Sequence, residues 1–319
     1  MDELPPFLDT QRPDVPDIAV PRGVTPFYLP KRPVRGRLVR LGPLADALLT
    51  RHHHADPITA LSGQALALVA VLATALKFRG SFSVQIKGDG PVRMLLADCT
   101  DGGALRGYAS ADPERIETLL AETPNPTARD LLGSGILVFT VDQGNDMERH
   151  QGIVSIEGDS LETMALHYFD TSEQMPCFLR LASARTPDGW RASALILERV
   201  AGTGGVDPAL DAAELDDAWG TALMLAGTLK DRELLDDTLP TERLLFNLFH
   251  TEGVAVDRPR ALAYGCRCSR ARLAEVLGTF GADDIDHMAE NGAITMTCEF
   301  CNLDFNFSRA DITAAASGR

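Results

Sequence analysis

The sequence predicts an α+β protein made of a mixed α/β N-terminal domain, a helical linker and a small C-terminal zinc-binding domain with four cysteines. Three observations indicate this division. Period-two and helical hydrophobic patterns alternate over the first two thirds of the chain. The composition then becomes acidic and helical after Asp207, and four of the six cysteines gather near the C-terminus.

The domain boundaries follow from these changes in pattern. We place the N-terminal domain at residues 38–208, the linker at 209–258 and the zinc-binding domain at 259–312. Residues 1–37 hold eight of the nineteen prolines and no long apolar run, so we expect a disordered or extended tail. A signal peptide would need a basic start and an apolar stretch of about 7–15 residues, so we expect a cytoplasmic protein. Residues 313–319 form a short C-terminal tail.

The N-terminal domain combines helices with strands. Residues 42–50 have helical spacing, and the longest apolar run, at 65–76, is shorter than the ~20 residues of a bilayer span, which predicts a buried core helix and no membrane contact. From Ser81 the pattern has period two, turns at residues 88–91 and returns, as a β-hairpin does. Further strands are expected at 135–141, 151–157, 178–182 and 192–197, and a further helix at 160–171.

Several weaker signals in this domain have structural explanations. The glycines at 88–91 and 202–205 lack the context of a phosphate-binding loop and are typical of turns. The adjacent His52, His53 and His54 would not converge on one metal ion without a special turn. Cys99 and Cys177 stand alone, as small core residues do. No catalytic constellation stands out, so we predict that the protein is not an enzyme.

The linker is predicted to contain two helices, at 210–229 and 242–250, joined by an acidic turn at 231–240. The second helix concentrates apolar residues on one and a half turns, so it must be covered in the resting protein. An ordinary packed helix would show the same pattern.

The C-terminal cysteines form two short pairs. Cys266 and Cys268 make a C-x-C, and Cys298 and Cys301 make a C-x-x-C between two expected strands, at 293–297 and 303–308. Two short cysteine pairs supply the four tetrahedral thiolate ligands that Zn²⁺ prefers, which predicts one zinc ion per chain. The competing interpretations are four free thiols, a purely structural zinc site, and a disulfide framework, which the small number of cysteines disfavours.

Zinc keeps its thiol ligands deprotonated, and thiolate is the form that oxidants attack. The nearest resolving thiols are local, which predicts Cys266–Cys268 and Cys298–Cys301 disulfides, although pairing across the site remains open. Small strained disulfide loops are readily reduced, so the site is expected to act as a reversible switch. Because the C-terminal domain is small, loss of zinc should unfold it.

These cysteine pairs, with Arg267, Ser269 and Arg270 around the first, resemble the bacterial heat shock protein 33 family of redox-regulated holdase chaperones. Residues 76–80, 85–91, 150–154, 157–159 and 172–176 are similar to the same family, and the resemblance covers residues 36–312. It implies an ATP-independent holdase that is inactive and monomeric when reduced and zinc-bound. Oxidation would release zinc and unfold a metastable linker. The N-terminal domain, residues 38–208, would then form a homodimer and bind unfolding or oxidatively damaged substrate proteins.

The net charge of −15 disfavours nucleic acids and anionic membranes as partners, because both require basic patches. High net charge suits a chaperone that must stay soluble while it exposes apolar surface. The alternative function is an interaction or regulatory adaptor with a permanent zinc ribbon. A thiol–disulfide oxidoreductase is disfavoured, because its C-x-x-C would open a helix rather than follow a strand.

Overall fold

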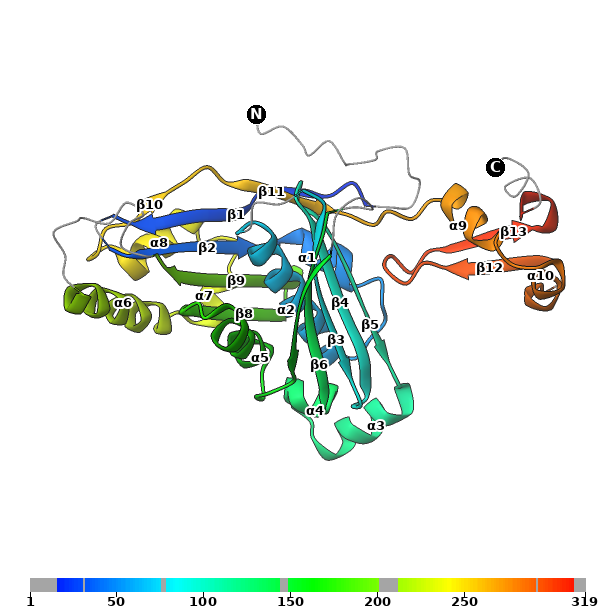
Figure 1. Ribbon diagram of the computed structural model, residues 1–319, viewed down its shortest axis with the longest axis horizontal. Coiled ribbons are helices and arrows are strands. Elements are labelled where there is room, and N and C mark those ends of the chain that lie inside the picture. The colour runs from blue at the N-terminus through cyan, green and yellow to red at the C-terminus, as the bar shows by residue number, and fades with distance from the viewer. Residues whose placement is uncertain are drawn as a thin grey trace.

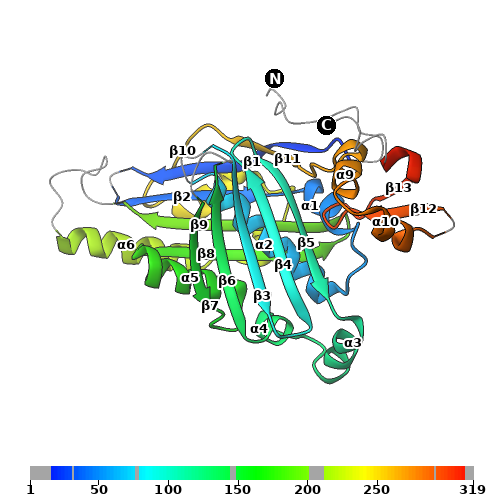
Figure 2. The ribbon, with the colours of Figure 1, turned by 45° about the vertical axis from the view of Figure 1, so that its right-hand side comes forward.

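The structure, a computed structural model, describes residues 16–30, 32–75, 79–143, 149–200, 212–290 and 292–312. A single eleven-stranded sheet forms the N-terminal part, with the order β7-β6-β3-β4-β5-β11-β1-β2-β9-β8 and β10 paired to β1. Its strands fall into two groups that run at a steep angle to each other (Figure 1). The four-cysteine module lies to one side of this sheet (Figure 2).

The first group of strands supports the helical linker, and the second supports the four-cysteine module. The first comprises β1 (Ala19–Leu29), β2 (Val34–Arg40), β8 (Cys177–Thr186) and β9 (Gly189–Arg199). The second comprises β3 (Ser81–Gly88), β4 (Val92–Thr100), β5 (Ala104–Ala111), β6 (Gly135–Asp142) and β7 (His150–Ser155). Strand β11 (Arg260–Tyr264) joins the groups, pairing parallel with β5 and antiparallel with β1.

The central helix α2 (Asp56–Ala73) lies between the two groups of strands and contacts both. Its alanine, leucine and valine residues are buried along most of its length, because strands face it on several sides. The helix is long and apolar enough to cross a bilayer by length and composition, yet 78% of it is buried inside the protein. The predicted core helix is therefore confirmed, with its end at Ala73.

The remaining helices of the N-terminal part border the sheet. They are α1 (Pro43–Leu49), α3 (Pro113–Glu122), α4 (Ala128–Leu132), α5 (Leu161–Tyr168) and the π-helical η1 (Phe169–Glu173). The predicted hairpin is confirmed as β3 and β4, and its turn packs closely on α4. A Cβ atom on Gly88 would lie 1.8 Å from the carbonyl oxygen of Leu132, so close backbone approach explains this glycine. Residues 202–205 lie outside the described part of the chain.

The prediction of a disordered tail over residues 1–37 is wrong from Ala19 onward. Strands β1 and β2 begin in this region and pair with each other in register, and Phe27 and Leu29 are buried. The many prolines of residues 1–37 had indicated a tail rather than two strands. Pro21 lies where the register of β1 shifts, which is a position at which a strand tolerates proline. Residues 1–15 lie outside the described residues.

The linker covers the outer face of the first group of strands with α6 (Ala212–Gly227), α7 (Asp231–Leu234) and α8 (Thr241–Phe249). Two of these helices agree with the prediction, and α7 occupies part of the predicted acidic turn. The short β10 (Ala255–Val256) pairs with β1, and β11 lies inside the sheet. The predicted boundary at residue 259 is therefore too early, because the strand at 260–264 belongs to the sheet.

The C-terminal module contains α9 (Arg270–Leu277), α10 (Ala282–Met288) and a hairpin of β12 (Ala293–Thr297) and β13 (Asp304–Ser308). The hairpin confirms the predicted strand pair on either side of the C-x-x-C. Among the described residues of the module, six buried apolar ones form a core of its own: Ala274, Leu277, Ile285, Ile294, Phe307 and Ile312. So small a core gives little stability by itself.

Candidate metal centre

Strand β11 positions the first cysteine pair. The chain leaves the sheet at Tyr264, and the backbone N–H of Gly265 donates to the carbonyl of Leu105 on β5 at 2.8 Å. A Cβ atom on Gly265 would lie 2.5 Å from the nitrogen of Leu105, so only glycine permits this close approach. Cys266 and Cys268 are thereby held against the end of the sheet.

The hairpin knuckle positions the second pair. The backbone N–H of Cys298 donates to Leu303 at 2.9 Å, and the N–H of Asn302 donates to Cys298 at 2.7 Å. Asn302 adopts a left-handed conformation, with φ of 53°, which asparagine tolerates better than most residues. This turn directs the side chains of Cys298 and Cys301 towards the C-x-C pair.

All four sulfur atoms lie within 4.8 Å of one another. Cys266 Sγ lies 3.3 Å from Cys268 Sγ and 3.6 Å from Cys298 Sγ, and Cys268 Sγ lies 3.4 Å from Cys301 Sγ. Zinc–sulfur bonds of ~2.3 Å in a tetrahedron place the sulfurs about 3.8 Å apart. The predicted cysteines therefore come together in an arrangement that fits a four-coordinate metal ion.

The protonation of these thiols depends strongly on their crowding. The hydrogen bond between the Cys266 and Cys268 side chains lowers the pKa of Cys266 to about 7. A hydrogen bond from Cys266 likewise lowers the pKa of Cys298, whereas the interaction with Cys266 raises the pKa of Cys301. The hydrogen bond with Cys266 also raises the pKa of Cys268. Crowding alone thus favours ionisation of two of the four thiols, and a bound metal ion would displace the protons of the other two.

Contacts with the loop after α1 hold the metal module against the sheet. The side-chain amide of Asn302 donates to the carbonyl of Arg51 at 2.8 Å, and Arg51 Nη1 donates to the carbonyl of Cys301 at 3.3 Å. His52 Nε2 lies 3.1 Å from the carbonyl oxygen of Phe300. Sequence analysis missed these contacts, because partners about 250 positions apart leave no local signal.

A second set of contacts involves strands β4 and β5. Asp98 is buried and accepts hydrogen bonds from Arg106 at 3.1 Å and from Arg267 at 2.8 Å. The ring of Phe300 meets Tyr108 edge-on, with 5.1 Å between centroids, and Arg106 stacks over its face at 4.1 Å. Residues inside both cysteine pairs therefore bind the N-terminal sheet directly.

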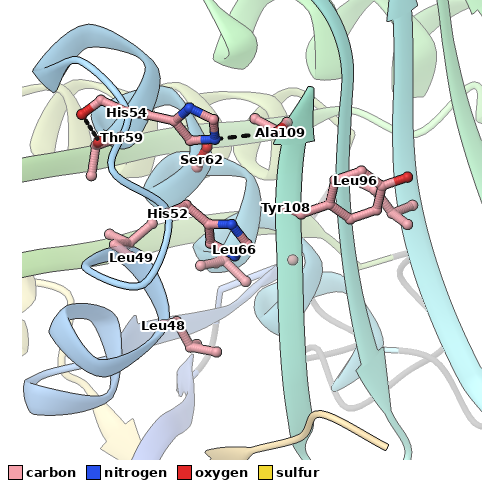
Figure 3. A pocket seen from close by; sticks show the side chains of 11 residues that line it. Leu48, Leu49, His52, His54, Thr59, Ser62, Leu66, Leu96, Tyr108 and Ala109 are labelled. Atoms are coloured by element: carbon pink, nitrogen blue, oxygen red, sulfur yellow. Dashed lines mark hydrogen bonds between the residues drawn. The ribbon is translucent and has the colours of Figure 1, made fainter. Parts of the chain in front are cut away.

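His52 and His54 line a small pocket together with Tyr108 of β5, whose ring contacts Phe300 (Figure 3). His54 Nε2 makes a hydrogen bond of 3.1 Å with the carbonyl of Ala109, as His52 does with Phe300. Burial lowers the pKa of both His52 and His54, so both rings are neutral at pH 7. Their ring nitrogens face backbone carbonyls, which accounts for these histidines without a metal ion.

The two remaining cysteines lie away from the cluster. Cys99 is fully buried on β4 and Cys177 is half-buried on β8. Burial raises the pKa of Cys99, and it raises the pKa of Cys177 to about 12. Both thiols therefore stay protonated and unreactive, as expected for core residues.

Comparison with known proteins decides the family. The model of the Hsp33 protein family matches residues 23–308. The 33 kDa chaperonin of Caulobacter vibrioides (strain NA1000 / CB15N) is 40% identical over 284 residues, covering 88% of this chain and 92% of that protein. The 33 kDa chaperonin of Pseudomonas fluorescens (strain SBW25) is 32% identical over 294 residues, covering 92% of each. The chain belongs to the Hsp33 family.

A solved structure of the Hsp33 homologue from Thermotoga maritima supports the fold. It superposes with a TM-score of 0.75 at 20% identity, covering 93% of this chain and 98% of that one. Membership of the Hsp33 family makes the protein a chaperone that binds client proteins. The relatives are named chaperonins rather than enzymes. The four-cysteine cluster is thus part of a chaperone.

Proposed function

We propose that this Hsp33-family chain is a redox-regulated, ATP-independent holdase of the bacterial cytoplasm. The reduced, zinc-bound monomer is inactive. Oxidation joins the four cysteines in two disulfides, releases zinc and loosens the linker, and the resulting dimer binds unfolding or oxidatively damaged proteins. One observation carries this proposal: the first two of the four clustered thiols lie directly after β11, and β11 is joined through β10 to the helices that cover an apolar face of the sheet.

Cys266, Cys268, Cys298 and Cys301 would hold the zinc ion. The compact set of four sulfurs suits zinc, and soft thiolate ligands favour it over hard cations such as Mg²⁺. Bound zinc would keep all four thiols ionised at neutral pH and add stability to a module whose own apolar core is small.

Oxidation removes the ligands as it forms the disulfides. Each disulfide would form from two thiolates with the loss of two electrons. These electrons, with two protons from water, reduce hypochlorite to chloride and water or peroxide to water. The proposed pairs are Cys266–Cys268 and Cys298–Cys301. The two sulfurs of a disulfide lie about 2.05 Å apart, which is closer than any sulfur–sulfur distance given above for the cluster. Forming either disulfide would therefore distort the cluster.

The distortion reaches the sheet through short connections. Arg267 lies between the first two cysteines and binds Asp98, while Phe300 and Asn302 flank Cys301 and bind β5 and the loop at Arg51. Movement of the cysteines therefore breaks contacts that hold the module. The freed module no longer restrains β11. Because the chain runs from the linker through β10 to β11, the linker is loosened as well.

The linker covers an apolar face that can serve clients once it is exposed. Trp219 on α6 and Leu245 and Phe249 on α8 are buried against strand residues that include Phe27 and Leu195. The ring of Phe27 stacks on that of Phe249 with 5.7 Å between centroids. Loss of this cover would expose the apolar residues of both layers, which is the surface that a holdase uses to retain unfolding chains.

Light scattering of a thermally unfolding client tests the proposal, with zinc release followed by a chromogenic chelator. We expect suppression of aggregation by the oxidised protein only, without ATP, and about one zinc ion released per chain. Size-exclusion chromatography of the same samples should show a monomer before oxidation and a dimer after it. Retained zinc, or zinc loss without client protection, would instead favour an adaptor with a permanent zinc ribbon.

A further inference from the structure

The strands beneath the linker are strongly basic in a chain of net charge −15. Strands β1, β2, β8 and β9 contain eight arginines and one acidic residue, Glu198. The linker between residues 212 and 258 contains ten acidic and four basic residues. The two layers therefore carry opposite charges.

The alternation of the strands separates their arginines by face. Glu198 accepts from Arg37 at 3.0 Å and from Arg35 at 2.6 Å, on the face away from the linker. The face towards the linker has arginines and no acidic strand residue. Its arginines, with one from the turn between β1 and β2, are Arg22, Arg32, Arg40, Arg180, Arg191 and Arg199.

Five ion pairs between described residues join this face to the linker, and all five have the same polarity. In each pair the arginine lies on the sheet side and the carboxylate lies on the linker side. Three of them are Arg32–Glu252, Arg180–Asp231 and Arg199–Asp216, with nitrogen–oxygen distances of 2.7, 2.6 and 2.5 Å. The other two are Arg22–Glu242 and Arg191–Asp237.

Arg40 is hydrogen-bonded directly by the backbone of the linker. Its guanidinium is buried and donates to the backbone carbonyls of Leu239 and, at 2.8 Å, Glu233. Both carbonyls belong to the linker, so departure of the linker leaves a cation without these two acceptors. The free energy cost of that loss is reduced if another chain supplies acceptors or carboxylates.

Apolar residues occupy the centre of the same face. Phe27, Leu29, Leu38, Leu195 and Leu197 are almost fully buried beneath α6 and α8. Once uncovered, the face would present an apolar centre with arginines around it. Arginine matches carboxylates with a planar, two-pronged donor, whereas a basic segment would be repelled.

We propose that this face selects client segments that combine apolar with acidic side chains, and that α6–α8 is its built-in occupant. The inference rests on the proposed function, because the face becomes available only when the linker leaves. Clients and linker then compete for the same arginines, so acidic apolar segments both bind best and prevent the linker from returning. Neutral apolar segments would pack on the apolar centre of the face but would leave its arginines without carboxylate partners.

The first test measures the binding of labelled peptides to the oxidised full-length protein by fluorescence anisotropy. One peptide has the sequence of residues 231–249, and its comparator has the five Asp and Glu residues of that sequence replaced by Asn and Gln. We expect the acidic peptide to bind at least about tenfold more tightly at low salt, with an advantage that shrinks at high salt. Equal binding would overturn the proposal, as would tighter binding of a single-stranded oligonucleotide of equal charge.

Two arginines of this face and two control arginines connect the preference to this face. The double variant Arg22→Gln, Arg180→Gln removes the partners of Glu242 and Asp231, and it should weaken binding of the acidic peptide by about tenfold and leave the amide peptide unaffected. The control double variant Arg93→Gln, Arg185→Gln, away from the linker, should keep the preference. An unchanged preference in the first variant, with normal protection of a client, would refute this inference alone. Failure of the oxidised wild type to protect any client would refute the proposed function.

Discussion

Arg267, between the two cysteines of the C-x-C pair, donates from Nη2 to Oδ1 of the buried Asp98 at 2.8 Å. Arg106 donates to the same oxygen at 3.1 Å. This carboxylate therefore ties the metal module to β4 and β5 through two guanidinium groups. The relationship connects the proposed switch to the domain that it would regulate.

Replacing Asp98 with Asn should make activation easier. The substitution keeps the size of the side chain but removes the charge that both arginines share, at a cost of roughly 1.5–3 kcal/mol. We expect the reduced variant to retain its zinc and to need less oxidant for half-maximal client protection. The control, Arg149→Gln, removes the surface ion pair with Asp142 and should activate like the wild type. An unchanged oxidant requirement in Asp98→Asn would exclude this contact from the coupling.

The sequence predicted the elements whose signals are local. The spacing of Cys298 and Cys301 between two alternating segments predicted the hairpin, and the apolar run after residue 65 predicted the core helix. Both signals depend on residues within a few positions of one another, so backbone periodicity reveals them. The four cysteines were likewise recognisable as two short chelating pairs.

Elements that depend on distant partners were missed. Strand β1 escaped notice because its prolines suggested a tail, while β2 and β11, which stabilise it, lie elsewhere in the sequence. Because β11 belongs to the sheet, the N-terminal domain also extends beyond the predicted boundary at residue 259. The hydrogen bonds between Asn302 and Arg51 and the common polarity of the linker ion pairs required the folded chain.

Replacing Gly265 with Ala should destabilise the attachment of the C-x-C pair. The added Cβ would lie 2.5 Å from Leu105 N and 2.8 Å from Ala104 Cβ, so β11 and β5 must separate. We expect a loss of about 1–3 kcal/mol of unfolding free energy, which is the usual cost of overpacking. Thermal unfolding of the reduced protein and competition with a zinc chelator measure the effect. Wild-type values in both assays would show that β11 and β5 can separate enough for the methyl group without a loss of stability.

Replacing Gly220 with Ala should have the opposite effect on the linker. Gly220 lies inside α6 and has no heavy atom within 4 Å of the position that a Cβ would occupy. Alanine should stabilise the helix by about 0.5–1 kcal/mol. We expect zinc release by oxidant at the wild-type rate and a slower gain of client protection. Parallel slowing of both processes would indicate that linker opening and zinc release are one step.

Tryptophan fluorescence can follow the linker directly. The chain has two tryptophans, Trp190 on β9 and Trp219 on α6, and Trp219 is buried against the sheet. In a Trp190→Phe variant, oxidation should shift the remaining emission to longer wavelength as Trp219 meets water. The complementary Trp219→Phe variant should change little, because Trp190 packs in the core around α2. If only the emission of Trp190 shifted, the conformational change would lie in the core around α2 rather than in the linker, and the prediction would be wrong.

Disulfide mapping tests which sulfurs join. In the thiol cluster the local pair Cys266–Cys268 is separated by 3.3 Å and the cross pair Cys268–Cys301 by 3.4 Å, so distance does not distinguish them. Chain connectivity does, because local partners stay close after zinc leaves and the module unfolds, whereas cross partners separate. We therefore expect mass spectrometry of the oxidised protein to find mainly Cys266–Cys268 and Cys298–Cys301. Predominant cross-linking between the pairs would mean that oxidation finishes before the module unfolds.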